Sequence, residues 1–354
     1  MRRILFTGLV PVALFVLLAG CSTDDAADEV VHDAAATDDS TPATADRSAD
    51  PSLACGTPDA EASSGGDADL TFTSGGVERR YEQVVPSAHD GETPVPLVLD
   101  LHGLMSPYGL ERAFTEMDET AEDEGFVVLY PMGAPDGQTP AWTVGAPRSD
   151  ASVAYLDELI TATGEDLCID LARVYATGFS NGGMMSSRLA CDLSDRIAAV
   201  ATVAGTIDFD GCDPERPVPW MAFHGTADDI LPMEGGAGPG LDAAGIDVAG
   251  ADAATGTAGQ LKPIRQSIAG IAERYGCEPE PPVERVSDHV TEEAYAGCDE
   301  GADVVFFTIE GGGHAWPGGL ANPALEGLLG QATQEISANG LMWEFFEQHP
   351  LPAG

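Results

Sequence analysis

The sequence predicts an α/β protein whose mostly parallel central sheet carries helices on both faces. Short apolar runs alternate along the chain with segments of helical spacing, which is typical of parallel strands joined by crossover helices. The apolar runs are continuous and do not alternate with polar residues, so each strand is expected to be covered on both faces. Both patterns indicate the same layered fold.

The expected elements follow one another from residue 95 onward. Continuous apolar runs predict strands at residues 95–101, 126–130, 173–178, 197–203, 219–223 and 304–309. Helical spacing predicts helices at residues 110–124, 151–163, 182–191, 264–275 and within 325–349. Gly125 and Gly164 end the first two helices, as glycine commonly does. Three of the strands are followed by motifs that indicate the function.

Length and charge limit the possible function classes. The chain has 354 residues, 44% of them hydrophobic, which is enough for one large core or two modest ones. Its 59 acidic residues against 15 basic ones give a formal net charge of −44. Such a charge repels nucleic-acid phosphates and anionic lipid surfaces, so a nucleic-acid partner is not expected.

The N-terminal residues have the layout of an export signal. Two arginines precede an apolar stretch at 4–18, which is short for a membrane span and suits a signal peptide. Residues 18–21 (LAGC) resemble the bacterial lipoprotein signal, in which the cysteine, here Cys21, becomes the lipidated first residue. The alternative is an ordinary secretory signal with a chance cysteine. We expect a signal peptide at 1–21, a cell-surface location, and membrane contact only through the lipid.

The rest of the chain divides into a tether and one domain. Residues 22–69 are expected to be an acidic disordered tether, because Asp, Ala, Thr, Ser and Gly dominate there. Residues 70–354 then form one catalytic domain. Within it, residues 235–259 are rich in Gly, Ala and Asp, and this composition favours a plain surface insertion over an active-site flap.

The cysteines indicate disulfides. Six of the seven remain if Cys21 is lipidated, and an even number in an exported chain is typical of disulfide bonding. Six cysteines allow 15 pairings, among which the sequence alone does not choose. Short spacing favours Cys191 with Cys212 and Cys277 with Cys298, which leaves Cys55 with Cys168. No cysteine or histidine spacing indicates a zinc site.

A nucleophile motif follows the strand at 173–178. Residues 178–183 (GFSNGG) have the layout of the G-x-S-x-G turn, which places a reactive serine between a strand and a helix. The glycines permit the sharp turn that strains Ser180, and the helix N-terminus directs N–H groups at developing negative charge. Because a glycine-rich chain often contains this motif by chance, the prediction depends on matching partner residues.

Two later strands end in candidates for the acid and the base of a catalytic triad. Asp228 and Asp229 follow the strand at 219–223, and both compete for the role of the carboxylate that orients the histidine. His314 lies in a glycine-rich loop after the strand at 304–309, which suits a general base. The chain order serine, aspartate, histidine is that of the α/β-hydrolases.

An oxyanion hole and a pocket complete the expected site. The N–H of Asn181 directly follows the nucleophile, and the Leu104 N–H lies in the loop after an early strand, as this chemistry requires. His102, in the same loop, is expected to be a structural turn residue because His314 fills the role of the base. Trp316 either floors a substrate pocket or anchors its loop.

These motifs resemble the poly(3-hydroxybutyrate) depolymerase-type esterases, which are close to bacterial feruloyl and acetyl-xylan esterases. The similarity spans about residues 70–350 and rests on the segments 101–103 (LHG), 173–186 (RVYATGFSNGGMMS), 224–228 (HGTAD) and 312–318 (GGHAWPG). The resemblance implies the α/β-hydrolase fold and extracellular ester cleavage with no metal or organic cofactor.

Carried over to single residues, the resemblance implies that Ser180 is the nucleophile and His314 the base. It favours Asp228 over Asp229, since the family acid stands three residues after Gly225. It also implies that Trp142 borders the acyl or alcohol pocket. The expected substrates are feruloyl or acetyl esters of plant polysaccharide, or short polyhydroxyalkanoate esters. The alternatives are a serine peptidase on the same fold and a non-catalytic ligand-binding lipoprotein.

Overall fold

The computed structural model describes residues 52–57, 65–145, 151–243, 255–257 and 261–352. The expected signal peptide at 1–21, with Cys21, lies outside these ranges, as does most of the expected tether at 22–69. None of the helices in the described ranges is long and apolar enough to span a bilayer.

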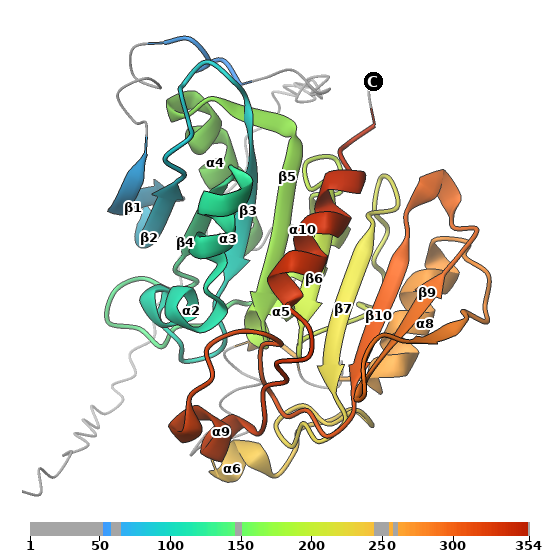
Figure 1. The fold of residues 1–354 in the computed structure, drawn as a ribbon. Helices are drawn as coiled ribbons and strands as arrows, with labels where there is room; N and C mark the ends of the chain where they lie inside the picture. The colour runs from blue at the N-terminus through green and yellow to red at the C-terminus, as the bar shows by residue number, and fades with distance from the viewer. Residues whose placement is uncertain (1–51, 58–64, 146–150, 244–254, 258–260, 353–354) are drawn as a thin grey trace, which may run out of the picture. The chain divides into compact units, whose positions relative to one another are not determined.

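The described residues form one sheet in the order β1-β2-β4-β3-β5-β6-β7-β10-β9-β8 (Figure 1). The strands are β1 Gly66–Ser74, β2 Val77–Val85, β3 Val95–Leu101, β4 Val127–Pro131, β5 Ile169–Phe179, β6 Ala199–Val203, β7 Trp220–Gly225, β8 Val283–Arg285, β9 Val290–Tyr295 and β10 Val304–Ile309. From β4 to β10 the neighbours in this order pair in parallel, while β1, β2, β9 and β8 extend the two edges with antiparallel pairs. The mostly parallel sheet is therefore confirmed, and all six expected strands lie in its parallel part.

The helices are α2 Tyr108–Thr115, α3 Met117–Glu124, α4 Ala151–Asp166, α5 Asn181–Asp192, α6 Gly240–Ala243, α8 Ile264–Arg274, α9 Pro323–Leu329 and α10 Ala338–Gln348. The helix expected at 110–124 is two helices, because Glu116 between them has a left-handed φ of 53°. The stretch expected within 325–349 is likewise divided into α9 and α10.

Two hydrophobic clusters cover the two faces of the sheet. Side chains of α4, α5 and α8 pack with Leu97 and Leu99 of β3, while α2, α3 and α10 pack with Val98 on the opposite face. Figure 1 shows α10 on the near face, over β5 and β6. The alternation of neighbouring β3 residues between two clusters explains why this strand is apolar at almost every position.

Three disulfides join the expected pairs, Cys55–Cys168, Cys191–Cys212 and Cys277–Cys298. The first ties residues 52–57 to the start of β5, where the Ser52 hydroxyl also donates to the Leu167 carbonyl at 2.7 Å. Together with β1, which begins at Gly66, this segment shows that structured residues precede the domain start expected at residue 70. Disulfides persist in oxidising compartments, which agrees with an exported protein.

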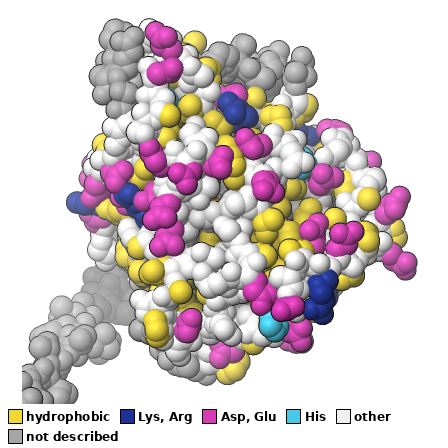
Figure 2. Space-filling model, viewed as in Figure 1, with side chains coloured by type: hydrophobic (Ala, Val, Ile, Leu, Met, Phe, Trp, Pro, Cys, Tyr) yellow, Lys and Arg dark blue, Asp and Glu magenta, His cyan; other side chains and the backbone are white. Residues whose placement is uncertain are grey.

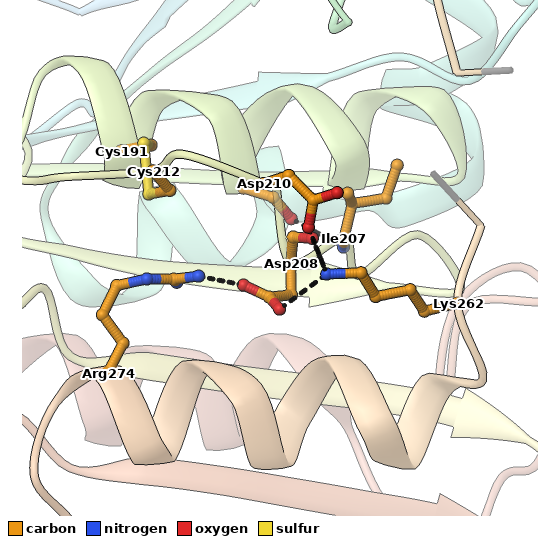
Figure 3. Close-up of polar contacts among 8 residues, drawn as sticks. Cys191, Ile207, Asp208, Asp210, Cys212, Lys262 and Arg274 are labelled. Carbon is orange, nitrogen blue, oxygen red and sulfur yellow. Dashed lines mark hydrogen bonds and ion pairs between the residues drawn. A yellow bond between two sulfur atoms is a disulfide. The ribbon is translucent and has the colours of Figure 1, made fainter. Parts of the chain in front are cut away.

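The loop between β6 and β7 is fastened from two sides (Figure 3). The Cys191–Cys212 disulfide connects it to α5. Lys262, the single lysine of the chain, donates to the Asp208 carboxylate at 3.1 Å and to Asp210 at 2.9 Å. Arg274, at the end of α8, pairs with the other oxygen of Asp208. The segment leading into α8 is thus held against this loop.

Candidate active site

Three candidate residues lie where parallel strands end. Ser180 directly follows β5, Asp228 lies three residues after β7, and His314 lies five residues after β10. Because β5, β7 and β10 belong to the parallel part of the sheet, their carboxyl ends meet at one edge. In the α/β-hydrolase fold this edge carries the catalytic residues.

Ser180 sits in a strained turn that two neighbouring glycines make possible. Its φ of 54° and ψ of −115° are unfavourable for a residue with a side chain. A Cβ at position 182 would lie 1.7 Å from the Leu101 carbonyl oxygen, and one at position 178 would lie 2.5 Å from the same oxygen. Only glycine therefore allows β5 and α5 to approach β3 this closely, and the approach presents Ser180 at the sheet edge.

Asp228 is the carboxylate that contacts His314. Asp228 Oδ2 accepts from His314 Nδ1 at 2.8 Å, and both side chains are buried. Asp228 Oδ1 accepts from the N–H groups of Ile230 at 2.9 Å and Leu231 at 2.8 Å. Asp229 is exposed. The geometry separates the two aspartates that the sequence left in competition.

The electrostatics of this pair keep the aspartate charged. Burial alone raises the pKa of Asp228, but the charge and hydrogen bond of His314 outweigh it and hold the pKa below its usual value. A second histidine, His224, lies 3.5 Å from Asp228 Oδ2 and donates through Nε2 to the Leu231 carbonyl at 2.8 Å. Burial lowers the pKa of His224, so the ring is neutral. Through its hydrogen bond to Leu231, His224 stabilises the loop that carries Asp228. Sequence reasoning had missed this role.

The loop after β3 is fixed by His102. Its Nδ1 donates to the Gly103 carbonyl at 2.7 Å, and its Nε2 accepts from the Gly133 N–H at 2.9 Å. Burial lowers the pKa of His102 to about 4, so the ring is neutral. As expected from the sequence, His102 is a structural residue. It holds the backbone that leads to Leu104, which lines the pocket beside Ser180 together with Asn181.

Trp142 does not border the pocket, contrary to the expectation. It is completely buried, and its indole N–H donates to the His102 carbonyl at 3.0 Å. Its backbone N–H donates to Asn181 Oδ1 at 2.7 Å, and Asn181 Nδ2 donates back to its carbonyl at 3.1 Å. Trp142 therefore connects the loop after β3 to the start of α5 through hydrogen bonds to His102 and Asn181.

Trp316 is a loop anchor and not a pocket floor. Its side chain is buried in the cluster under α10, and its indole N–H donates to Asn339 at 2.8 Å. Asn339 in turn donates to the Thr115 carbonyl at the end of α2, at 2.9 Å. Trp316 thus fixes the loop that carries His314 to two helices. Of the two roles that the sequence allowed for Trp316, the structure favours the loop anchor.

A pocket of about 320 Å³ opens beside Ser180 and His314. Its walls are mainly apolar and come from the loop after β3, from α2 and α5, and from α6 and α9, which Figure 1 shows side by side below the strand ends. Three of its apolar side chains are about half exposed: Met105, Leu110 and Leu328. Among the residues that the structure describes, no lysine or arginine lines it. The site suits an uncharged, apolar group of considerable size.

The segment at 235–259 contributes to this pocket. Its described residues Ala237, Leu241, Thr255 and Thr257 line the wall. The Thr255 carbonyl accepts from the Val144 N–H at 2.7 Å, which ties the segment to the loop that carries Trp142. The interpretation as a plain surface insertion, which the composition favoured, is therefore wrong for these residues. Glycine-rich composition carries no information about what a loop contacts.

The pocket also contains one acidic side chain that sequence reasoning missed. Glu111, on α2, is buried and lines the wall. No motif marks it, since it stands among ordinary helix residues. In contrast to this one acid, acidic side chains are spread widely over the face in Figure 2, where basic ones are few. Within the described ranges, no three His, Cys, Asp or Glu side chains are grouped so that they could hold a metal ion.

The fold and the arrangement of the strand ends define an α/β-hydrolase. An acetyl xylan esterase from Aspergillus awamori has the same fold, with a TM-score of 0.52 over 80% of this chain and 99% of that one, at 14% identity. No family model matches the sequence.

Sequence relatives define the family. The chain is 31% identical over 250 residues to a putative esterase, NocK, of Nocardia uniformis subsp. tsuyamanensis, covering 68% of this chain and 71% of that protein. It is 30% identical over 278 residues to feruloyl esterase B of Piromyces equi, covering 75% of this chain. It spans only 44% of the length of that fungal enzyme. The chain belongs to this esterase family, whose members are carboxylic ester hydrolases.

Proposed function

We propose that the protein is an extracellular serine esterase that cleaves carboxylic esters through an acyl-enzyme. The observation that carries this proposal is the buried hydrogen bond between Asp228 and His314, together with a pocket that His314 and Ser180 both line. Asp228 holds the His314 ring with its protonated Nδ1 toward the carboxylate. This orientation leaves Nε2 as the basic nitrogen.

In the proposed mechanism Ser180 Oγ attacks the ester carbonyl carbon while His314 Nε2 takes the hydroxyl proton. The backbone N–H groups of Leu104 and Asn181 stabilise the oxyanion of the tetrahedral intermediate. The intermediate collapses, the bond to the alcohol oxygen breaks, and His314 returns the proton to the leaving alcohol. Water then attacks the acyl carbonyl carbon while His314 Nε2 takes a proton from it. The bond to Ser180 Oγ breaks, His314 returns the proton to Ser180, and the acid leaves.

The pocket supports a bulky acyl group over acetyl. Its volume is about 320 Å³ and its walls are mainly apolar. An acetyl group would leave most of these walls uncovered, whereas an aromatic hydroxycinnamoyl group or a longer aliphatic chain would bury apolar area. Thr255 and Thr257 offer hydroxyls on one wall. Among the candidate substrates, feruloyl esters are thus favoured over acetyl-xylan, and hydroxybutyryl esters are intermediate in size.

Attachment to the membrane through a lipid on Cys21 is part of the proposal. The sequence at 18–21 supports it, together with the three disulfides, which suit an exported chain. A Cys21→Ala variant is expected to move from the membrane fraction to the medium. Equal membrane retention of the variant and the wild type would contradict the anchor.

A substrate panel tests the esterase proposal. Wild type, Ser180→Ala and the control Ser87→Ala, at an exposed serine, are assayed with nitrophenyl acetate, nitrophenyl octanoate, methyl ferulate and a peptide nitroanilide. We expect hydrolysis of the bulky esters by wild type and the control only. Faster cleavage of the anilide would favour a peptidase, and no turnover by folded, oxidised protein would favour a ligand-binding lipoprotein.

A further inference from the structure

Two buried carboxyl groups flank the loop that carries the Leu104 N–H. Asp100 lies on β3 just before the loop, and Glu111 lies on α2 just after it. Both side chains are buried, and Glu111 lines the pocket beside Ser180. The triad chemistry uses neither of them. Among the described residues, no basic side chain forms an ion pair with either carboxyl, so their burial needs another explanation.

Glu111 contacts the backbone next to both reacting groups. Its Oε2 accepts from the Gly103 N–H at 3.3 Å, and Gly103 precedes Leu104. The N–H of Phe179, which precedes Ser180, also faces the carboxyl and favours its charged form. One side chain on α2 therefore joins the loop of the proposed oxyanion donor to the strand that ends at the nucleophile.

The packing at this junction is tight. A Cβ at position 103 would lie 3.2 Å from the Phe179 ring and 3.6 Å from Ser180 Cβ. The Phe179 ring in turn packs against the His314 ring, with centroids 4.7 Å apart. A displacement of the loop at Gly103 would therefore reach the nucleophile and the base together.

The electrostatics favour a protonated form of the two carboxyls. Asp100 Oδ2 accepts from the Thr115 hydroxyl at 2.7 Å. Asp100 Oδ1 and Glu111 Oε1 have no hydrogen-bond partner within the part of the chain that the structure describes. Burial raises the pKa of Asp100 to about 7, and burial together with the Asp100 charge raises that of Glu111 well above its usual value. A proton on the pair would relieve the repulsion between two charged carboxyls.

The surrounding charges favour retention of that proton. Asp118 on α3 adds negative charge near Asp100, and Tyr130 on β4, also near Asp100, is itself kept protonated by burial. Arg112 on α2 is paired with Asp118 and two further carboxylates. His102, directly after β3, adds no positive charge, because burial lowers its pKa and keeps the ring neutral. Within the described ranges, the pair thus lacks a cation of its own.

We propose that Asp100 and Glu111 form a buried carboxyl pair and that Glu111, through the Gly103 N–H, positions the oxyanion loop against the nucleophile turn. The inference rests on the proposed esterase function, because the pair acts through Leu104 and Ser180 and does not touch the reacting atoms. It predicts that loss of the pair lowers kcat more than it raises KM. Ionisation of the pair would place two like charges in the interior and loosen the loop.

The test compares variants of Glu111 in the full, oxidised protein on nitrophenyl butyrate. Glu111→Leu removes the acceptor for the Gly103 N–H, and we expect kcat to fall about 10- to 100-fold, with KM changed less than about threefold. Glu111→Gln can accept the same N–H, and its kcat at pH 7 should recover to within about threefold of wild type. Glu119→Leu, at an exposed site on α3, is the matched control.

The pH profile separates positioning from mere stability. In wild type, kcat should decline at alkaline pH as the carboxyl pair loses its proton, whereas Glu111→Gln, whose amide does not ionise, should keep its kcat there. Superimposable profiles would overturn the proposal, and so would an unchanged kcat of the leucine variant. If the leucine variant does not fold, the comparison of wild type with the glutamine variant still decides.

A second readout does not require turnover. The infrared carbonyl band of a protonated carboxylic acid at pH 7 should be present in wild type and reduced in Glu111→Gln. An inactive wild type that keeps this band would count against the esterase function and support the protonated carboxyl pair. If the wild type is active and Glu111→Gln shows the same carbonyl band as the wild type, the result would count against the carboxyl pair and leave the esterase function standing.

Discussion

His314 Nδ1 lies 2.8 Å from Asp228 Oδ2, while two backbone N–H groups hold Asp228 Oδ1. A carboxylate fixed at both oxygens cannot rotate, so the histidine ring has one orientation. The buried surroundings strengthen the interaction, because water does not screen it. This relationship is the feature on which the proposed proton transfer depends.

Replacement of this carboxylate should abolish most of the activity. Asp228→Asn keeps the shape but removes the charge that stabilises the protonated ring, so we expect kcat to fall by about 10³- to 10⁴-fold. Asp229→Asn, at the exposed neighbour, should change kcat less than about twofold. Steady-state ester hydrolysis measures both. Similar losses in the two variants would show that Asp228 has no special role.

The close approach of α5 to β3 gives a second prediction. Gly182→Ala would place a Cβ 1.7 Å from the Leu101 carbonyl oxygen, so α5 or β3 must move. We expect the free energy of unfolding to fall by about 3 kcal/mol and the esterase activity to be lost with it. Gly109→Ala, on α2 with open space around it, should be neutral or slightly stabilising. Denaturant unfolding monitored by fluorescence compares them, and an intact Gly182→Ala protein would refute the steric argument.

The parallel sheet and the three strand-end residues could be predicted because both depend on local patterns. A buried parallel strand is apolar at successive positions, as β3 and β4 are, and the turn at Ser180 requires glycines at fixed places. The edge strands β1 and β8 were not predicted. They carry many exposed side chains, so no apolar run marks them.

The pocket could not be predicted in the same way. Trp142 and Trp316 are both large and adjacent to functional segments, yet both point into the interior and make hydrogen bonds there. The walls come instead from residues far apart in sequence, such as Leu241 on α6 and Leu328 on α9, two helices that are in contact. Glu111 looks like any helix residue until its burial is known.

The buried Asp100 predicts an unusual dependence of stability on pH. Burial raises its pKa from 3.8 to about 7, so between these values the native protein keeps a proton that the unfolded chain has released. The free energy of unfolding should therefore decrease as the pH rises from about 4 to about 7. Asp100→Asn should reduce this slope, with Glu111 contributing the remainder, and should stabilise the protein at pH 7 by on the order of a few kcal/mol.

Urea unfolding at pH 5 and pH 7 measures this effect. Asp123→Asn, at an exposed position on α3, serves as the control and should behave like wild type. If Asp100→Asn and wild type lose the same stability between the two pH values, Asp100 is already ionised in the native state at pH 5 and burial does not raise its pKa.

The single lysine should matter for the pocket wall. Lys262 donates to Asp208 and Asp210 (Figure 3), and its neighbour Leu261 lines the pocket. Lys262→Met should lower the free energy of unfolding by about 1 kcal/mol and raise KM for octanoyl more than for acetyl esters. Lys262→Arg keeps the charge and is the control. Equal KM values for the two variants would show that the ion pairs do not hold the wall.

Labelling with a fluorophosphonate probe, followed by mapping of the modified peptide, is the sharpest test of Ser180 as the nucleophile. Such probes react with serines that a neighbouring base activates. We expect stoichiometric labelling of Ser180 in wild type, none in Ser180→Ala, and slow labelling in Asp228→Asn. Labelling of another serine, or no labelling of folded and oxidised wild type, would contradict this role of Ser180.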